Sequence, residues 1–422
     1  MAEVPADAVP VSGLSAARPA LIRALNEQLL LDHIRSSGPY SRADLARVSG
    51  LSKPTVSLAL ANLERAGLVR LAGQRTGVPG RTALLYEVRP EAGFVLGLDI
   101  GHRYLRGGVA DLAGEVRVRL SVPVRATTVT DRVAELVALA DELCERAGIT
   151  RAEVIQTVVG SPGVYDPQRN LMALTGGLHD WDRPEALAGL RTAFGPGLAI
   201  ENDVDAAALA ERALGVGTDA DNFAFVHIGS GVGMGLVLGG RLHRGVHGVA
   251  GEIAFLPLGG VPPAWAEMTP NGDGRVTAGP EGVIIDPAEA SRRGTLETAA
   301  GADGVVRAAR RSGLTGFATA QGVFEAAAAG DLRAAAVVAG EARLVAAAIC
   351  CVISVVDPSL IVLGGGIGQA PGFADAVTAA LAAMAPVLPE VRVSALGTDV
   401  VVDGCLAEAA AMAWTQVIAA LP

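Results

Sequence analysis

Hydrophobic residues between positions 21 and 66 recur every three to four positions, which is the spacing of one face of an α-helix. They fall into three groups, which short segments rich in serine and glycine separate. The pattern therefore predicts three short helices. These cover 21–36, 42–48 and the segment between Ser52 and Gly67; the defining hydrophobic positions are Leu21, Ile22, Leu25, Leu29 and Ile34 in the first helix and Val56, Leu60 and Leu63 in the third.

The residues that precede the second and third helices are typical N-caps. Ser41 precedes the second helix and Asp44 follows three positions later, which is the capping-box arrangement. Ser52 precedes the third helix, and Pro54 stands in its first turn, where proline is tolerated. The sequence Ser-Gly-Leu at 49–51 predicts a tight turn between the two helices. Together these signals predict a helix-turn-helix.

Two short apolar segments, 68–71 and 83–88, follow the third helix and predict a pair of strands. The sequence between them is rich in glycine and arginine, as in an exposed hairpin loop. Three helices followed by a hairpin form the pattern of a winged helix-turn-helix, which we place over residues 21–90. Residues 1–20 are rich in alanine, proline and valine without periodicity and predict a flexible tail.

The third helix has the features of a DNA recognition helix. Its capped N-terminus offers backbone N–H groups and the positive end of the helix dipole to a phosphate. We expect polar residues of this helix to contact phosphates or base edges, and arginines of the wing to enter a minor groove. A three-helix packing module without a ligand has the same pattern, so this alternative stays open. The expected contacts are Ser52, Lys53, Thr55 and Ser57 in the helix and Arg75 and Arg81 in the wing.

The distribution of charge agrees with duplex DNA as a partner of the first 90 residues. The chain has 422 residues and a formal net charge of −10. Residues 1–90 contain eleven Lys and Arg against seven Asp and Glu, a net +4, so the remainder has a net −14. A basic segment joined to an acidic one fits a protein in which only the first segment meets phosphate.

Other features of the sequence predict a cytoplasmic protein. No apolar stretch of about 18 residues is free of charges or glycine runs, so we expect no membrane span. The first residues lack a basic segment followed by an apolar one, so we expect no signal peptide. None of the cysteines forms a C-x-x-C pair, and we interpret them as small buried residues rather than as disulfide partners or zinc ligands. They are Cys144, Cys350, Cys351 and Cys405.

From Phe94 onward, short apolar strands alternate with glycine turns and alanine-rich helices. Such alternation favours an α/β fold. The expected strands are 95–100, 107–111, 154–159, 198–200, 222–228, 233–238 and 359–363; the expected helices are 296–311, 318–329, 332–356 and 406–421, with a loop over 257–287.

Three glycine segments each follow an apolar strand. Glycine at such a turn lets backbone N–H groups approach phosphate oxygens closely, so the three segments together favour a nucleotide cleft, present or ancestral. The alternative is that all three are merely tight hairpins. The residues concerned are Asp99 and Gly101 in the first segment, Gly229, Gly231 and Gly233 in the second, and Gly364, Gly365 and Gly366 in the third.

Polar residues between these segments suit a sugar. Asn202 and Asp203 follow the strand at 198–200, and together they can present an amide and a carboxylate to a polyol. The carboxylate of Asp203 can also accept the proton of a hydroxyl that attacks a phosphoryl group. Glu252 and Glu297 can supply further sugar contacts, although a solvated or ion-paired loop carboxylate is as good an interpretation of Glu252.

Several of these segments resemble the ROK family, which comprises repressors and sugar kinases. The resemblance covers residues 21–415 and lies in Gly97–Gly114, Gly160–Val164, Glu201–Glu211 and, most specifically, Gly229–Ile253. It implies a winged helix-turn-helix followed by an actin-like, ribonuclease-H-like body of two lobes over residues 91–422. It also implies sugar binding between the lobes and assembly into a homodimer or homotetramer.

The resemblance implies roles for the same polar residues. Asn202, Asp203 and Glu252 match the family's sugar contacts, and Asp203 also matches its catalytic base. Glu297, in the sequence Gly-Thr-Leu-Glu, matches a further glutamate that contacts the sugar.

The chain also departs from the family pattern. Phe255 stands where the family has a histidine that binds both sugar and zinc, and Thr295 stands where it has its last zinc-binding cysteine. We therefore expect the zinc site to be lost and no metal to be bound. Arg103 lies in the first glycine segment, where its long side chain would crowd a nucleotide, so we expect no ATP cofactor.

These observations lead to a DNA-binding transcriptional regulator of sugar-metabolism genes, of the repressor branch, whose kinase-like body senses a sugar without acting as an enzyme. One alternative is an ATP-dependent sugar kinase with a DNA-binding extension. Another is a regulator whose pocket has lost sugar binding and answers to a different ligand or a partner protein.

Overall fold

The computed structural model describes residues 19–75, 83–166, 168–175, 178, 180–257, 276–278, 283–285 and 287–420. The chain separates into two compact units: unit 1 comprises Met1–Phe94, Ala110–Glu115 and Ala410–Pro422, and unit 2 comprises Val95–Val109 and Val116–Ala409. The predicted tail lies almost wholly outside the described residues, and the sequence-based boundaries at residues 20 and 90 stay predictions.

Unit 1 contains the three predicted helices and the predicted hairpin. A short third strand, β1, lies just before the second helix and pairs with β3; it was not predicted. The strand order is therefore β1-β3-β2. The hydrophobic positions Val56, Leu60 and Leu63 of the third helix are fully buried, as predicted. The elements are α1 (Pro19–Ser37), β1 (Tyr40–Ser41), α2 (Arg42–Ser49), α3 (Lys53–Arg65), β2 (Val69–Arg75) and β3 (Ala83–Val88).

The predicted helix caps of unit 1 are confirmed. The Ser41 side chain accepts a hydrogen bond from the Asp44 backbone N–H, and the Asp44 carboxylate accepts one in return from the Ser41 N–H. Gly50 ends α2 in the left-handed conformation, with φ 70°, which glycine adopts without strain. Ser52 caps α3 through the Thr55 backbone N–H. Both helices of the predicted helix-turn-helix therefore begin where the sequence indicated.

The buried face of α1 differs from the hydrophobic stripe seen in the sequence. Leu25 is 55% exposed, and Ile22 and Leu29 are also exposed; Ile34 is buried as predicted, but the other buried leucines are Leu30 and Leu31. Two hydrophobic stripes share the same helical spacing in this helix, so spacing alone does not tell which stripe faces the core.

The last turns of α14 (Val400–Ala419) belong to unit 1, whereas its first half belongs to unit 2. Trp414 is 3% exposed, and its indole N–H donates to the Leu112 carbonyl at 2.9 Å. The Arg35 guanidinium of α1 lies 6.0 Å from the centre of the Trp414 ring. One continuous helix thus belongs in part to each unit.

Unit 2 contains two five-stranded sheets with the same strand order. In each sheet the order is third, second, first, fourth and fifth along the chain: β6-β5-β4-β7-β10 in one and β13-β12-β11-β16-β17 in the other. This repetition is the two-lobed, ribonuclease-H-like arrangement that the sequence predicted. The strands of the first sheet are β4 (Phe94–Ile100), β5 (Tyr104–Asp111), β6 (Val116–Pro123), β7 (Val154–Ser161) and β10 (Leu198–Asn202); those of the second are β11 (Phe223–Ile228), β12 (Val232–Leu238), β13 (Arg241–Leu242), β16 (Leu360–Gly364) and β17 (Glu390–Val393).

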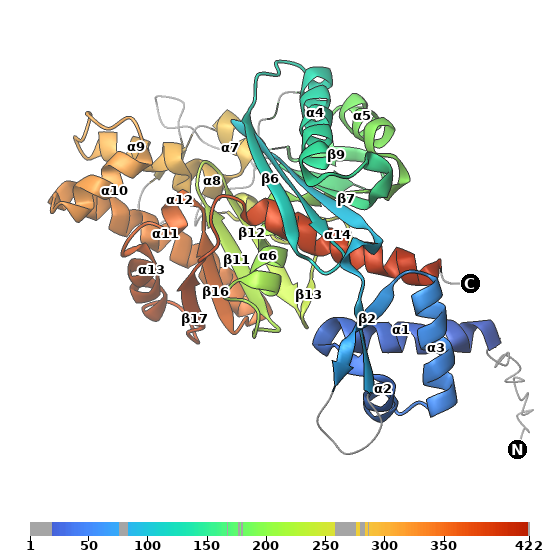
Figure 1. Ribbon diagram of the computed structural model, residues 1–422. Helices are drawn as coiled ribbons and strands as arrows, with labels where there is room; N and C mark the ends of the chain where they lie inside the picture. Colours follow the sequence, from blue (N-terminus) through green and yellow to red (C-terminus); the bar gives the residue numbers. More distant parts are fainter. Residues whose placement is uncertain are drawn as a thin grey trace, which may run out of the picture. The chain divides into compact units, whose positions relative to one another are not determined.

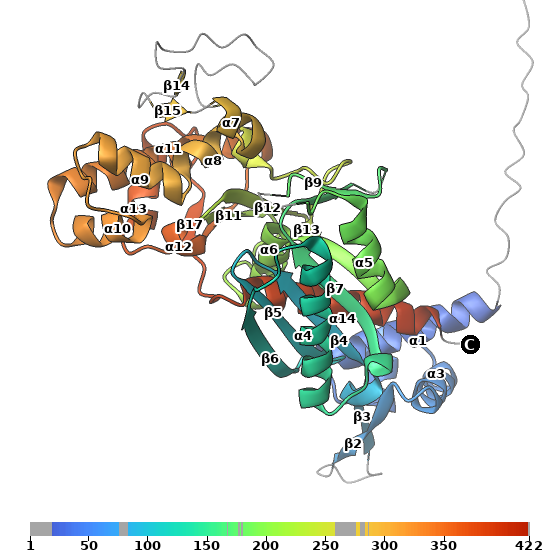
Figure 2. The same ribbon diagram turned by 90° about the horizontal axis from the view of Figure 1, so that it is seen from above.

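Helices pack beside both sheets. The pair α4 and α5 lies beside the first sheet in both views, and a larger group that includes α9, α10, α11 and α13 lies beside the second (Figures 1 and 2). Two small hairpins complete the described part, β8 (Val164–Asp166) with β9 (Leu171–Ala173) and β14 (Val276–Ala278) with β15 (Val283–Ile285). The helices are α4 (Val129–Ala147), α5 (Pro184–Phe194), α6 (Asp203–Leu214), α7 (Pro287–Arg293), α8 (Thr295–Ala300), α9 (Ala302–Arg311), α10 (Ala320–Ala328), α11 (Leu332–Val356), α12 (Gly365–Gly368) and α13 (Phe373–Ala382).

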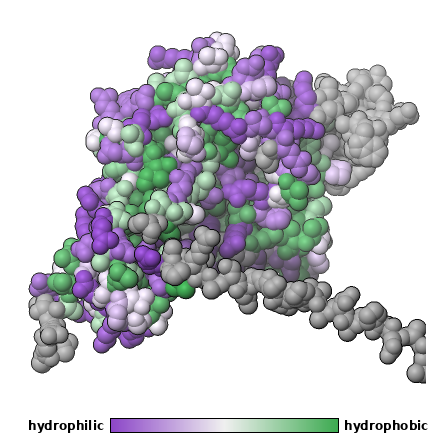
Figure 3. All heavy atoms as spheres, turned by 90° about the vertical axis from the view of Figure 1, so that its right-hand side faces the viewer, coloured by the Kyte–Doolittle hydropathy of each residue, from purple (hydrophilic) through white to green (hydrophobic). Residues whose placement is uncertain are grey.

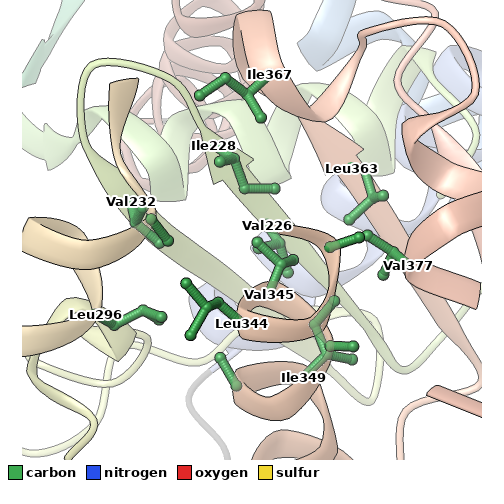
Figure 4. Close-up of a cluster of buried hydrophobic side chains, with 14 of the residues drawn as sticks. Val226, Ile228, Val232, Leu296, Leu344, Val345, Ile349, Leu363, Ile367 and Val377 are labelled. Carbon is green, nitrogen blue, oxygen red and sulfur yellow. The ribbon is translucent and has the colours of Figure 1, made fainter. Parts of the chain in front are cut away.

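The core of the second lobe forms between its sheet and α11. Val226 and Ile228 of β11 face Val345 and Ile349 of α11, and Leu363 of β16 joins them (Figure 4). Parallel strands buried in this way read as continuous apolar runs, which explains why β11 and β16 were predicted correctly.

Two helices, Leu332–Val356 and Val400–Ala419, are long and apolar enough to cross a bilayer by length and composition alone. No such segment was expected from the sequence. In the structure, 56% of the apolar window of α11 is buried within the protein. Over the face in Figure 3, hydrophobic and hydrophilic residues are interspersed. The apolar composition of α11 is therefore that of a core helix.

Some sequence-based boundaries need correction. The predicted helix over 296–311 is two helices that meet at Gly301, and the closing helix begins at Val400 rather than at residue 406. Of the cysteines, Cys144 and Cys405 are buried as expected, but Cys351 is exposed and Cys350 is partly exposed; all four are free thiols.

Candidate functional site

The N-terminal end of α3 is a polar surface of unit 1. Ser52, Lys53 and Ser57 are exposed, and Thr55 is partly exposed. The hydroxyl groups of Ser52 and Thr55 lie 2.8 Å apart, which fixes both near the free backbone N–H groups of the first turn. The four predicted contacts of the recognition helix therefore lie within two turns of one helix end, as a DNA contact requires.

Of the two predicted wing contacts, the structure describes only Arg75, and that residue is ion-paired. Arg75, at the end of β2, donates to the Asp44 carboxylate at 3.1 Å, so its guanidinium is paired with the capping residue of α2. Asp44 also pairs with Arg47, and hydrogen bonds, first of all from Ser41, hold the pKa of its carboxyl below the usual value. Arg81 lies outside the described residues.

In unit 2, Asn202 and Asp203 stand where β10 passes into α6. The Asn202 side chain caps α6 by accepting from the Val204 and Asp205 N–H groups, and its amide donates to the Gly163 carbonyl at 3.0 Å. Asn202 thus has a structural role that the sequence analysis did not anticipate. Asp203 is the first residue of α6, and one of its carboxylate oxygens accepts from the Val204 N–H.

The predicted sugar contacts form one group of carboxyls. Burial raises the pKa of Asp203, and burial followed by the charges of Asp203 and Glu297 raises the pKa of Glu252 to about 7. The charges of Asp203 and Glu297 act on Glu252, and the charge of Glu297 acts on Asp203, so the fold brings the three side chains near one another. Glu297 is tied in place, because it accepts from the Val232 N–H at 3.0 Å and from the Arg293 guanidinium at 2.6 Å.

The first glycine segment presents a carboxyl that is already paired. Asp99 is 5% exposed and accepts from the Arg106 guanidinium at 3.1 Å. Burial, followed by the charge of Asp203, raises the pKa of Asp99 to about 7 despite this ion pair. Arg103 was the cation expected in this segment, but the residue that reaches Asp99 is Arg106.

The glycine segments occupy equivalent places in the two sheets. The turns at Gly101 and at 229–231 each join the first and second strands of a sheet, and Gly364–Gly366 follow the fourth strand of the second sheet. Gly365 has φ 79°, and a side chain there would meet the Ile228 carbonyl. Gly233 instead lets β12 approach Val204 of α6, which is a packing role.

Two residues of this region carried no signal in the sequence analysis. His102 follows Gly101, and burial, followed by the charge of Arg132, lowers its pKa even though Asp203 opposes this. Arg293 donates to the Ser230 carbonyl at 3.0 Å and to Glu297, so a guanidinium lies beside the second glycine turn. His102 lies within the first glycine segment, but nothing in the sequence indicated that it or Arg293 would lie near Asp203 and Glu297; the tertiary fold brings them there.

The positions of the expected zinc ligands do not suit a metal. Phe255 is 40% exposed and has no donor atom, and the Thr295 hydroxyl donates to the Leu256 carbonyl at 2.6 Å. Within the described ranges, no group of three or more His, Cys, Asp or Glu side chains is arranged to hold a metal ion. The residues present therefore do not fit a tetrahedral zinc site of nitrogen and sulfur ligands.

Residues 95–411 match the model of the ROK family. The chain belongs to the ROK family. Residues 25–70 match a second model, described as winged helix-turn-helix DNA-binding, so both parts of the predicted fold class are confirmed.

Known ROK proteins that resemble this chain include regulators and kinases. The xylose repressor of Bacillus subtilis (strain 168) is 25% identical over 237 residues, which are 56% of this chain and 61% of the repressor. The match thus spans about 61% of that relative's length. A crystal structure of a ROK family transcriptional regulator, described as a homologue of the E. coli MLC protein, has a TM-score of 0.72 and 22% identity and covers 94% of this chain and 99% of that one.

The ROK hexokinase from Thermus thermophilus has a TM-score of 0.59 and 26% identity, and the similarity covers 74% of this chain and 97% of the hexokinase. Membership of the family therefore supports the fold and leaves the activity to be argued from the sites.

Proposed function

We propose that this ROK protein is a DNA-binding transcriptional regulator, a repressor of sugar-metabolism genes, whose kinase-like unit senses a sugar. The observation that carries the proposal is the capped, exposed N-terminus of α3, which presents Ser52, Lys53 and Ser57 within a winged helix-turn-helix. A sugar kinase has no need of this unit, whereas a regulator depends on it.

The proposed sugar site consists of the carboxyl side chains of Asp203, Glu252 and Glu297. Carboxyl and carboxylate oxygens accept hydrogen bonds from sugar hydroxyls, and the raised pKa of Glu252, about 7, lets it also donate. Asn202 caps α6 and so holds the site in place. It contacts the sugar only through side-chain atoms whose hydrogen bonds the cap does not use.

The helix α14 is the element through which the ligand acts on unit 1. Glu201, next to Asn202, is ion-paired with Arg244, which also donates to Glu408 of α14 at 3.1 Å. Six residues further along the same helix, Trp414 packs in unit 1. A ligand that favours one position of α14 changes the population of the DNA-binding state, provided that it binds the two states unequally.

Lys53→Ala tests the DNA contact. Because Lys53 is exposed at the end of α3 that faces phosphate, its loss is expected to weaken binding to all duplexes and to reduce the slope of log affinity against log salt by about one. Fluorescence anisotropy with labelled duplexes at several salt concentrations measures both. Arg65→Ala, at the other end of α3, is the matched control. An unchanged affinity and slope in Lys53→Ala would defeat the assignment.

A second candidate function is an ATP-dependent sugar kinase, which the position of Asp203 beside Glu252 and Glu297 favours. The ion pair between Asp99 and Arg106 argues against a kinase. Asp99 is the acidic residue of the first glycine segment, and its carboxylate is already bound to the Arg106 guanidinium. A coupled assay with ATP and a panel of hexoses and N-acetylated amino sugars separates the two functions. Turnover that Asp203→Asn abolishes would establish the kinase.

Metal content gives an independent test of the proposed loss of zinc. Since Phe255 and Thr295 replace two ligands, the purified protein is expected to contain far less than one zinc per chain. Inductively coupled plasma mass spectrometry of protein prepared without chelators measures this. About one zinc per chain would overturn the proposal.

The same proposal implies a homodimer or homotetramer on DNA, because two recognition helices about one helical turn apart read a two-fold-related operator. It also implies a cytoplasmic location, where the DNA is, no resident cofactor and no membrane partner.

A further inference from the structure

Leu58 of α3 is a large hydrophobic side chain that the core of unit 1 does not use. It is 57% exposed, whereas Val56, Leu60 and Leu63 of the same helix are fully buried. Single exposed leucines are common on protein surfaces, so exposure alone has no functional meaning. The position of Leu58 is more informative, because it lies in the centre of the third helix of the winged helix-turn-helix.

Leu58 belongs to an apolar face of α3 that adjoins the proposed DNA contacts. Residues three or four positions apart share a helix face, so Pro54, Leu58 and Ala61 lie on one side of α3. Pro54 is exposed and Ala61 is partly exposed, so this side is turned away from the core. The exposed Ser57 precedes Leu58, and the exposed Lys53 precedes Pro54. The apolar face is therefore continuous with the surface that we propose to enter the major groove.

The side chains of α3 that usually recognise bases by paired hydrogen bonds are already engaged. Guanine and adenine are commonly read by arginine, lysine, asparagine or glutamine. In α3, Asn62 donates to the buried Glu27 at 2.6 Å, and Arg65 donates to the Asn62 side-chain oxygen at 3.0 Å. The sequence of α3 contains no other arginine, asparagine or glutamine, and its one lysine is the proposed phosphate contact Lys53. The outward face is thus left with apolar groups and the hydroxyl of Ser57.

We propose that Leu58 is a specificity-determining residue, which packs against the C5-methyl group of a thymine in the major groove. Thymine presents a methyl group at its major-groove edge, and an apolar side chain recognises it by direct contact. The contact removes apolar surface of both partners from water. This inference rests on the proposed DNA-binding function and adds to it the base that this position of α3 selects.

A second copy of the chain is the other partner that an exposed leucine of α3 could have. Leu58 borders a hollow of about 370 Å³, which Ile22 and Asn26 of α1 also line. Pro54 and Thr55 line the same hollow, so a protein bound there would cover the N-terminal end of α3. The position of Leu58 beside Ser57 favours DNA, and the test separates the two partners.

The test replaces thymine by uracil, which pairs in the same way and lacks only the methyl group. The full-length protein selects from a library of random duplexes, and the most enriched duplex is resynthesised with deoxyuridine at one thymine position at a time. Fluorescence anisotropy measures the affinity of wild type, Leu58→Ala and Leu25→Ala for each duplex. Leu25, which is 55% exposed on α1, is the matched control. Circular dichroism verifies that the variants are folded, and sedimentation velocity without DNA measures their oligomeric state.

Wild type and Leu25→Ala are expected to bind about fourfold more weakly when uracil replaces one particular thymine, which is the usual effect of losing one buried methyl group. Leu58→Ala is expected to bind the thymine and uracil duplexes equally, because the partner of the methyl group is gone. The inference is wrong if no thymine position responds to uracil, if Leu58→Ala keeps the full response, or if Leu58→Ala changes the oligomeric state and not the response.

The failure of this inference is distinct from the failure of the proposed function. If the selection enriches no duplex, DNA sequence recognition itself is refuted, and the role of Leu58 with it. If the selection enriches a duplex that wild type binds with the same affinity whether it contains thymine or uracil, the regulator remains and only the role of Leu58 is refuted.

Discussion

Leu60→Ala is expected to destabilise unit 1 by about 2–5 kcal/mol, because it removes a buried side chain and leaves a cavity. Leu60 is 0% exposed, in the centre of the helix that carries the proposed DNA contacts. Small units are stable by only about 5–15 kcal/mol, so this loss is a large part of the total. We expect operator affinity to fall with the folded fraction of unit 1. Urea unfolding followed by circular dichroism, together with anisotropy on duplex DNA, measures both effects.

Leu71→Ala is the matched control for this prediction. Leu71 is 49% exposed on β2, so its truncation opens no cavity and is expected to change stability by less than about 0.5 kcal/mol. The account of the core would be contradicted if the two variants unfolded at the same urea concentration and bound DNA equally well.

The stability of unit 2 is expected to fall as the pH rises from about 5 to about 9. Burial raises the pKa of Asp99 and Glu252 to about 7 and that of Asp205 to about 8. The folded chain therefore holds protons that the unfolded chain releases near pH 4. Their contribution to stability is complete below about pH 4 and is lost as the pH rises through 7 and 8. Each pKa unit corresponds to about 1.4 kcal/mol, so the fall is large.

Thermal unfolding across this pH range checks the prediction. Asp205→Asn removes one titrating group and is expected to flatten the fall in Tm, whereas Asp182→Asn, at an exposed carboxylate, keeps the wild-type profile. A Tm that rises between pH 6 and 9, or a slope that Asp205→Asn leaves unaltered, would show that these carboxyls are not protonated in the folded chain.

Local signals in the sequence were sufficient to predict the helix-turn-helix of unit 1. The caps at Ser41 and Ser52 and the turn at Gly50 depend on neighbouring residues alone, and the structure confirms them. The buried face of α1 was not predictable in the same way, because its choice depends on partners such as Asn62 of α3, which donates to the buried Glu27 at 2.6 Å. That contact joins positions 35 residues apart.

In unit 2, too, some features follow from neighbouring residues and others only from the tertiary fold. Buried strands such as β11 and β16 were predicted from their apolar runs. The edge strands β6 and β17 were missed because their residues are exposed or only partly buried and form no apolar run. The candidate site was predicted through its carboxyls. The guanidinium groups of Arg106 and Arg293 were not, because their pairing with Asp99 and Glu297 is a consequence of the tertiary fold.

Ion pairs connect the segment beside the proposed sugar site to the first half of α14. Arg244 joins Glu201, beside the proposed sugar site, to Glu408 of α14, and the same helix ends against Leu112 and Arg35 in unit 1. In the proposed function, this connection lets a sugar-kinase fold serve as a sensor.

The central claim is that α3 reads a DNA sequence, and selection from random duplexes by the intact protein tests it most directly. Sequencing of the bound fragments, with and without candidate sugars, is expected to reveal one enriched motif of two-fold-related half-sites whose recovery changes when the effector is present. Recovery of every duplex alike, with binding that disappears in moderate salt, would contradict the account.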